Sequence, residues 1–239
     1  VWPGMTWWYA FAAARYHPEF MVRGLHASFE HYARNPRVFN TVPGQFSEWF
    51  DGESLINRGM RLSPWEPPRF LWAAVEGIGG LMVLPGKPRI NPLRSPDWLW
   101  TGVYRVRYHG DQISFFNARM GQDLHIFGNV AFDVECCCEV FEEDLSHQIK
   151  VSHAGVHAMA FRSGGRVLVA VGSCRDRATI TSIRLDAVLE PDTQYAVRYA
   201  GSERGQWSKP VRGAGRKFMH YSMRLESKGY HLVELNGSD

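Results

Sequence analysis

The chain has 239 residues, a formal net charge of +3 at pH 7, 45% hydrophobic residues and 21% charged residues. This is the composition of an ordinary globular protein, long enough for one large domain or two modest ones. The small, evenly spread charge does not indicate a nucleic-acid or acidic-membrane partner, and no apolar stretch reaches the roughly 18 residues that a membrane span needs.

The N-terminus does not resemble a secretory signal, because Val1-Trp2-Pro3-Gly4 is not a basic region and no small-residue cleavage site follows an apolar run. The chain has no initiator methionine and begins within a motif. We therefore expect a piece of a longer protein, and since nothing marks it as secreted, a cytoplasmic one.

Helical spacing of apolar residues predicts three helices in the first third of the chain. The first follows Pro3-Gly4, ends near Arg15 and is apolar nearly all round, so we expect it to be buried, with Trp8 in the core. The other two should run from about 18 to 34 and from about 67 to 79. Their inward residues should be Met21, Leu25, Phe29 and Tyr32 in the second and Leu71, Trp72, Ala74, Val75 and Ile78 in the third. The outer face of the second should carry Arg23, His26, Glu30 and His31.

A long loop, about residues 35–64, separates the last two helices. Loops of this length inside a compact domain are uncommon and usually functional. This one is dense in glycine, proline, aromatic residues and carboxylates, from Val42 to Glu53. It is the most informative segment of the sequence.

Alternating apolar and polar residues after residue 98 predict an antiparallel sandwich of short strands. The expected organisation is therefore α+β, with a helical part at 1–84, a Pro/Gly-rich linker at 85–97 and an antiparallel β domain at 98–239. The predicted strands cover 103–108, 113–115, 124–126, 130–134, 156–161, 167–171, 178–185, 195–199, 222–225 and 231–235.

The cysteines and histidines do not predict a metal site. Three of the four cysteines are consecutive, Cys136 to Cys138, a spacing that suits neither zinc nor a disulfide, so we expect free thiols packed in a strand. His153 and His157 lie in a predicted strand, where a separation of four residues spans about 13 Å, too far for one zinc ion. We expect no metal and no organic cofactor.

Several motifs share an order and spacing over residues 1–82, about a third of the chain. Together they resemble the end of the catalytic barrel in glycogen-debranching, amylo-α-1,6-glucosidase-like glycoside hydrolases, relatives of the glucoamylase-like inverting enzymes. The motifs are Trp2-Pro3-Gly4, the run from Pro43 to Gly52, Asn57-Arg58-Gly59-Met60, Ser63-Pro64-Trp65 and the helix around Phe70 to Ala74.

The resemblance implies that the helical part is the C-terminal end of an (α/α)6 barrel of six helical hairpins, with the active site at one end. In such enzymes a carboxylate in a Pro-x-Glu-like loop is the general base, and Glu48 is the matching position. Phe46-Ser47 stands where relatives often have proline just before the glutamate. The general acid and the rest of the barrel would lie outside this chain.

The residue types suit this chemistry without the family. Inverting hydrolysis needs one acid to protonate the leaving oxygen and one carboxylate to activate water, roughly 6.5–9.5 Å apart. Aromatic faces can stack on sugar rings, and charged groups can bond hydroxyls. The expected substrate contacts are Trp2, Trp7, Trp49, Asp51, Glu53, Arg58 and Trp65. The alternative is structural: Glu48 caps a turn, and the tryptophans fill the core.

The expected function is hydrolysis of α-glucosidic bonds in an α-glucan. Two alternatives stay open. A phosphorylase of the same barrel would replace water by phosphate and need a cationic pocket instead of the base, which the carboxylate-rich loop argues against. The second is a carbohydrate-binding or purely structural β module attached to an inactive barrel end, which sugar binding by residues 98–239 alone, without activity in the complete protein, would indicate.

Overall fold

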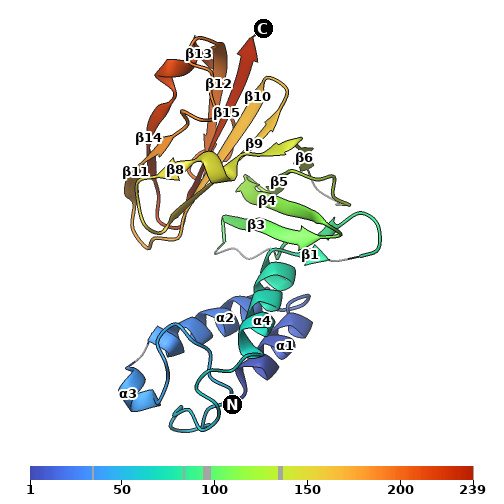
Figure 1. The fold of residues 1–239 in the computed structure, drawn as a ribbon, viewed down its shortest axis with the longest axis vertical. Coiled ribbons are helices and arrows are strands. Elements are labelled where there is room, and N and C mark those ends of the chain that lie inside the picture. Colours follow the sequence, from blue (N-terminus) through green and yellow to red (C-terminus); the bar gives the residue numbers. More distant parts are fainter. Residues whose placement is uncertain (34, 83, 94–97, 134–136, 239) are drawn as a thin grey trace. The chain divides into compact units, whose positions relative to one another are not determined.

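The structure is a computed structural model that describes residues 1–33, 35–82, 84–93, 98–133 and 137–238. The chain forms two compact units (Figure 1). Unit 1 contains Val1–Met82 and Arg89–Ser95, and unit 2 contains Val83–Pro88 and Pro96–Asp239.

Unit 1 is helical, and the three predicted helices are present (Figure 1). The third begins as an α-helix and continues as a π-helix, and a two-stranded antiparallel sheet follows. Arg34, the predicted end of the second helix, lies outside the described residues. The elements are α1 (Pro3–Ala13), α2 (Pro18–Ala33), α3 (Pro36–Phe39), α4 (Glu66–Trp72), η1 (Ala73–Ile78), β1 (Leu81–Met82) and β2 (Arg89–Ile90).

The helices pack around the fully buried side chain of Trp7. Its ring meets Phe46 and Phe70 edge-on, with centroids 5.6 and 5.2 Å away, and its Nε1 donates to Ser28 Oγ over 2.9 Å. Edge-to-face packing and a satisfied indole N–H are the arrangement that makes a buried tryptophan stabilising. Trp7 thus joins α1 to α2, to α4 and to the long loop.

Several predicted core positions need correction. Leu71 is 60% exposed, because the buried face of the helix is formed by Phe70, Ala73 and Ile78, and Leu71, one residue after Phe70, points to another side. Trp8, expected in the core, is 45% exposed. His31, expected on the outer face of α2, is buried, because Phe39 and Phe50 pack edge-on against its ring. The inward prediction holds for Met21 and Leu25, and the side chains of Phe29 and Tyr32 lie outside the described residues.

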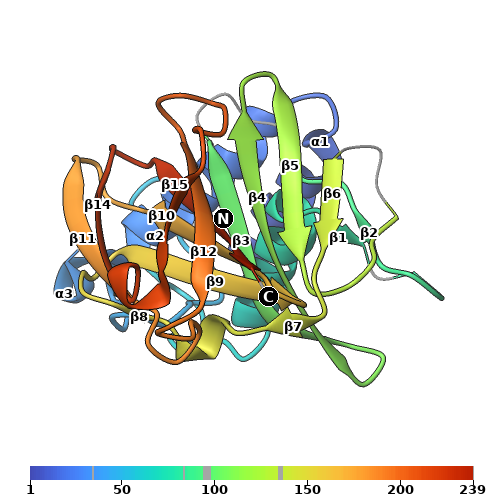
Figure 2. The ribbon, with the colours of Figure 1, turned by 90° about the horizontal axis from the view of Figure 1, so that it is seen from above.

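Unit 2 consists of antiparallel strands except for β6, which runs parallel to β5 (Figure 2). The three sheets have the strand orders β13-β12-β15-β10-β9-β7, β14-β11-β8 and β3-β4-β5-β6. The strands are β3 (Trp100–Tyr108), β4 (Asp111–Met120), β5 (Asp123–Gly128), β6 (Cys137–Val140), β7 (Glu143–Asp144), β8 (Lys150–Val151), β9 (Val156–Ser163), β10 (Arg166–Ser173), β11 (Thr179–Arg184), β12 (Gln194–Gly201), β13 (Val211–Ala214), β14 (His220–Leu225) and β15 (Tyr230–Ser238). Two 3-10 turns, η2 (Ser146–Gln148) and η3 (Gly215–Lys217), complete it.

The six-stranded sheet is a middle layer with a hydrophobic core on each face, so the β domain has three layers rather than two. Val167, Val169 and Val171 of β10 pack with residues of the three-stranded sheet. Leu168 and Ala170, which point the other way, pack with residues of the four-stranded sheet. A strand buried on both faces needs a continuous apolar run, which is the sequence of β10.

One predicted strand, 130–134, is not found in its described part. Residues 130–132 belong to no strand, Asp133 N–H donates to the Pro88 carbonyl over 3.0 Å, and Val134 lies outside the described residues. Asn129 replaces the strand ladder with its side chain, accepting from Ser114 N–H and donating to the Gln112 carbonyl, both over 2.8 Å. The apolar alternation that predicted a strand here includes Phe132. Its side chain packs edge-on against Phe115, although residue 132 belongs to no strand.

The cysteine prediction is only partly tested. Cys137 lies in β6 but is exposed rather than packed, and both Cys137 and Cys174 are free thiols. Cys136 lies outside the described residues. Among the helices of the described ranges, none is long and apolar enough to cross a membrane.

Candidate catalytic loop

Glu48 is held in the long loop by a reciprocal pair of hydrogen bonds with Met60. Its backbone N–H donates to the Met60 carbonyl over 2.9 Å, and its Oε2 accepts from Met60 N–H over 3.0 Å. The side chain is partly exposed. One carboxylate oxygen is thereby held by a backbone donor, which fixes the orientation of the group.

The residue after Glu48, Trp49, belongs to a pair of stacked indoles. The ring of Trp49 stacks on that of Trp2, with centroids 6.5 Å apart and planes 22° apart. Trp2 is 45% exposed, so the pair offers aromatic surface to solvent. Gly59 makes the arrangement possible, because a Cβ there would lie 2.4 Å from Trp49 Cδ1 and 2.8 Å from Glu48 Oε2. The structure therefore brings together Trp2, Glu48 and Trp49 from the predicted set.

Sequence reasoning missed a second carboxylate close to Glu48. Glu66, the first residue of α4, is fully buried and pairs with Arg69, Oε1 to Nη1 over 3.0 Å. Burial raises the pKa of Glu66, and the negative charge of Glu48 raises it further, against the opposing effects of Arg69 and the Gly4 backbone. The signal available in the sequence was an acidic residue at a predicted helix start, between Trp65 and Pro67.

Arg69 extends this group to α1. Its guanidinium lies over the ring of Trp8, 4.9 Å from the centroid. Gly4 leaves room for the contact, since a Cβ there would lie 2.7 Å from Arg69 Cδ and 2.8 Å from Glu66 Oε2. Trp8 therefore makes a cation–π contact with Arg69 at the surface of the unit instead of filling its core.

Asp51 has a local structural role. Its Oδ1 accepts from Ser54 N–H and Ser54 Oγ, both over 2.8 Å, and from Glu53 N–H over 3.2 Å. These bonds, chiefly those from Ser54, lower the pKa of Asp51. Such an Asx turn closes the tip of the loop, where Phe50 bridges to Asn57. Glu53 and Arg58 are exposed on this tip, and Arg58 N–H donates to the Trp49 carbonyl over 3.2 Å.

The other two predicted tryptophans are placed differently. Trp7 has no exposed surface, so in this unit it packs helices together and offers no face to a ligand. Trp65 is 39% exposed and immediately precedes α4, next to Glu66.

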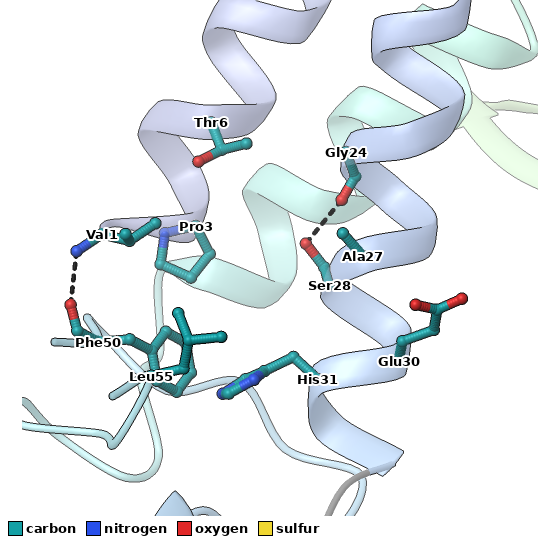
Figure 3. A pocket seen from close by; sticks show the side chains of 10 residues that line it. All are labelled: Val1, Pro3, Thr6, Gly24, Ala27, Ser28, Glu30, His31, Phe50 and Leu55. Atoms are coloured by element: carbon teal, nitrogen blue, oxygen red, sulfur yellow. Dashed lines mark hydrogen bonds between the residues drawn. The ribbon is translucent and has the colours of Figure 1, made fainter. Parts of the chain in front are cut away.

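A cavity of about 210 Å³ lies in unit 1 between α1, α2 and the loop (Figure 3). None of the predicted site residues lines it, and its wall includes Pro3, Phe50 and Leu55. Figure 3 shows the Ser28 hydroxyl directed back to the Gly24 carbonyl of its own helix, over 2.9 Å. Glu30 and His31 also line this cavity, so its polar groups are different residues from those of the Glu48 loop.

Within the part of the chain that the structure describes, no group of three or more histidine, cysteine, aspartate or glutamate side chains could hold a metal ion. The chemistry available at the loop is that of carboxylates, backbone donors and indole faces.

No family model matches the chain, and no curated protein matches it. Solved structures match parts of it. A GH30 endoxylanase from Clostridium papyrosolvens C71 has a TM-score of 0.27 and 8% identity, over 36% of this chain and 21% of that one. A GH27 β-L-arabinopyranosidase from Geobacillus stearothermophilus has a TM-score of 0.27 and 11% identity, over 36% and 18%. The GH44 endoglucanase Cel44A from Clostridium thermocellum has a TM-score of 0.26 and 12% identity, over 34% and 17%.

The chain spans about a fifth of the length of these solved structures. Overlap of this extent assigns neither a fold nor an activity to the chain.

Proposed function

We propose that the chain is the C-terminal part of an inverting glycoside hydrolase that cleaves α-glucosidic bonds in α-glucans, with Glu48 as general base. The observation that carries the proposal is the geometry of Glu48. Its side chain is partly exposed, one carboxylate oxygen is fixed by Met60 N–H, and the next residue, Trp49, stacks its indole on that of Trp2.

In this mechanism Glu48 takes a proton from a water molecule while that water attacks the anomeric carbon. The bond between this carbon and the glycosidic oxygen breaks, and a general acid on the opposite side of the sugar protonates the leaving oxygen. Trp2 and Trp49 would stack on the apolar face of a sugar ring, and Arg58 and Glu53 would bond its hydroxyls.

The rest of the barrel is a required partner in this proposal. A six-hairpin barrel needs about 350 residues, from twelve helices of about 12 residues plus loops. Unit 1 would supply its last helices, and the general acid would come from the preceding part of the protein. Such an enzyme would be cytoplasmic and would need no metal.

The test is Glu48→Gln in the full-length protein, because glutamine keeps size and hydrogen bonding but not basicity. The rate on maltooligosaccharides should fall at least ~10²-fold while substrate binding stays nearly intact. Asp51→Asn and Glu53→Gln are matched controls in the same loop and should act mainly on the Michaelis constant. Unchanged turnover in Glu48→Gln would remove Glu48 from the site.

The stereochemical outcome is a second readout. An enzyme that works through water should release β-glucose from an α-linked substrate. NMR in the first minutes, before mutarotation, reads the configuration. Release of α-glucose would exclude the inverting mechanism.

A further inference from the structure

An aromatic group lies in unit 2 where one of its hydrophobic cores opens to solvent. On each of three strands, the side chains that face this core end with a half-buried ring. Tyr199 lies two residues after Val197 on β12, Tyr221 two residues before Met223 on β14, and His231 two residues before Val233 on β15. We call Tyr199, Tyr221 and His231 the aromatic triad. Each ring continues the apolar face of its strand, so the triad stands at the open end of the space between the six-stranded and three-stranded sheets.

The triad is ordered by its own contacts. The rings of Tyr199 and Tyr221 stack, with centroids 5.3 Å apart and planes 10° apart. His231 is tilted against both, 5.9 Å from each, and its Nε2 lies 3.3 Å from Tyr221 Oη. Strand register pairs Gly201 with His231, which sets Tyr199 diagonally across from the histidine on the same face.

A cavity of about 270 Å³ opens at the triad. Gly201 helps to keep the cavity open, because it is the next residue after Tyr199 on the same face of β12 and has no side chain. A Cβ there would lie 3.5 Å from His231 Nδ1 and 3.2 Å from the Tyr230 carbonyl. This volume is close to the lower end of the roughly 300–1,000 Å³ that small-molecule sites occupy.

The charges around the cavity balance. Two arginines and two glutamates line it, Arg204, Arg224, Glu203 and Glu226. Arg224 Nε is paired with Glu226 Oε1 over 3.0 Å. Burial lowers the pKa of His231 to about 4 and raises that of Tyr221 to about 12, so both are uncharged near neutral pH. A cavity with no net charge favours neither an anion nor a cation.

We propose that this cavity is a binding site for a neutral sugar ring, separate from the Glu48 loop and independent of the function proposed for it. A sugar has apolar C–H faces that suit the aromatic wall and many hydroxyls that suit the paired charges and the neutral phenol and imidazole. No catalysis is assigned to this site. It would hold one ring of an oligosaccharide.

The test uses the 239-residue chain and measures binding by calorimetry and ligand-observed NMR. The probes are maltotriose, cellotriose and xylotriose, with adenosine as a flat aromatic and inorganic phosphate as an anion. At least one sugar should bind saturably with a Kd below ~1 mM. Failure of all three to saturate at 10 times that concentration overturns the proposal, as does tighter binding of adenosine or phosphate.

Variants locate the site. Tyr221→Ala should weaken sugar binding at least ~10-fold, whereas Tyr104→Ala, an exposed tyrosine on β3 of the same unit, should leave it unchanged. Arg224→Ser serves as a second variant on an exposed residue that is not part of the core, and it should weaken binding ~3-fold or more. Glu48→Gln should have no effect here, which separates this site from the catalytic proposal. Equal loss in Tyr104→Ala, or full binding by Arg224→Ser, counts against it.

Discussion

Gly59 is the residue on which the geometry around Glu48 depends most directly. Gly59→Ala would place a methyl group against the Trp49 ring and the Glu48 carboxylate, so one of them must move. We expect unit 1 to lose roughly 1–3 kcal/mol of stability, the usual cost of overpacking.

Gly52→Ala is the matched control, because it lies in the same loop with no atom within 4 Å of the added Cβ. Urea unfolding of both variants, followed by tryptophan fluorescence, measures the difference. Equal stability of the two variants would mean that the loop yields easily around Glu48.

Glu66 should make the stability of unit 1 depend on pH. Its folded pKa is raised above the ordinary value of 4.5, so its contribution is fully present below that value and is lost as pH rises through the folded pKa. Glu66→Gln has no carboxyl group to ionise, so the variant should not lose stability in this way as pH rises. The melting temperature of the variant relative to wild type should therefore rise by roughly 2–5 °C between pH 4 and pH 7.5.

Glu30→Gln, an exposed change on α2 of the same unit, should show no such trend. Calorimetric melting of the three proteins at both pH values is the measurement. A variant that gains most at pH 4 would reverse the sign and refute the burial of a costly charge at Glu66.

Part of this site could be predicted from residue types. Glu48 with Trp49 was accessible because carboxylates and aromatics gather in one long loop. The stack of Trp49 on Trp2 joins positions far apart in sequence, and only the resemblance had linked them. Glu66 was missed because burial, which sets its pKa, depends on Gly4 and Arg69 packing around it. The Asx turn of Asp51 was also hidden, since an aspartate in a loop suits a turn and a ligand equally.

Strand β11 offers a matched pair at the scale of an element. Ile183 is fully buried in the core between two sheets, and Ile180 on the same strand is 73% exposed. Ile183→Ala should cost about 2–5 kcal/mol, while Ile180→Ala should cost about 0.5 kcal/mol or less. Urea unfolding of unit 2 by circular dichroism checks this, and similar costs would contradict the assigned faces of β11.

Elements differ in how far their sequence determines them. The predicted helices and most of the strands are confirmed, because their apolar periodicity is long and regular. The π-helical turn of η1 could not be foreseen, since no change of composition accompanies it. Short strands such as β7 and β8 owe their pairing to neighbours distant in sequence. The sequence predicted a sandwich of two sheets and not the third layer. An apolar run such as β10 indicates a buried strand, but it does not tell whether one sheet or two cover it.

At the scale of the whole chain, we expect no glycosidase activity from the 239 residues alone. The general acid, which contributes typically ~10²–10⁴-fold, lies outside the chain in our proposal, and the positioning by the remaining barrel is also missing. Purified chain incubated with maltooligosaccharides or isomaltose should release glucose only at the background rate. Robust turnover would show that the acid is within these residues.

The burial of β10 on both faces has a consequence for the protein when it is not folded. From Val167 to Gly172 this segment has no charge and no proline, and valines alternate along it. Such a stretch is a strong candidate for pairing with copies of itself once it is released from its sheet. The apolar run that buries β10 on both faces of the native protein becomes an aggregation-prone segment after unfolding. Heat denaturation of unit 2 should therefore end in aggregation, and its thermal lifetime will be set by how fast β10 is uncovered.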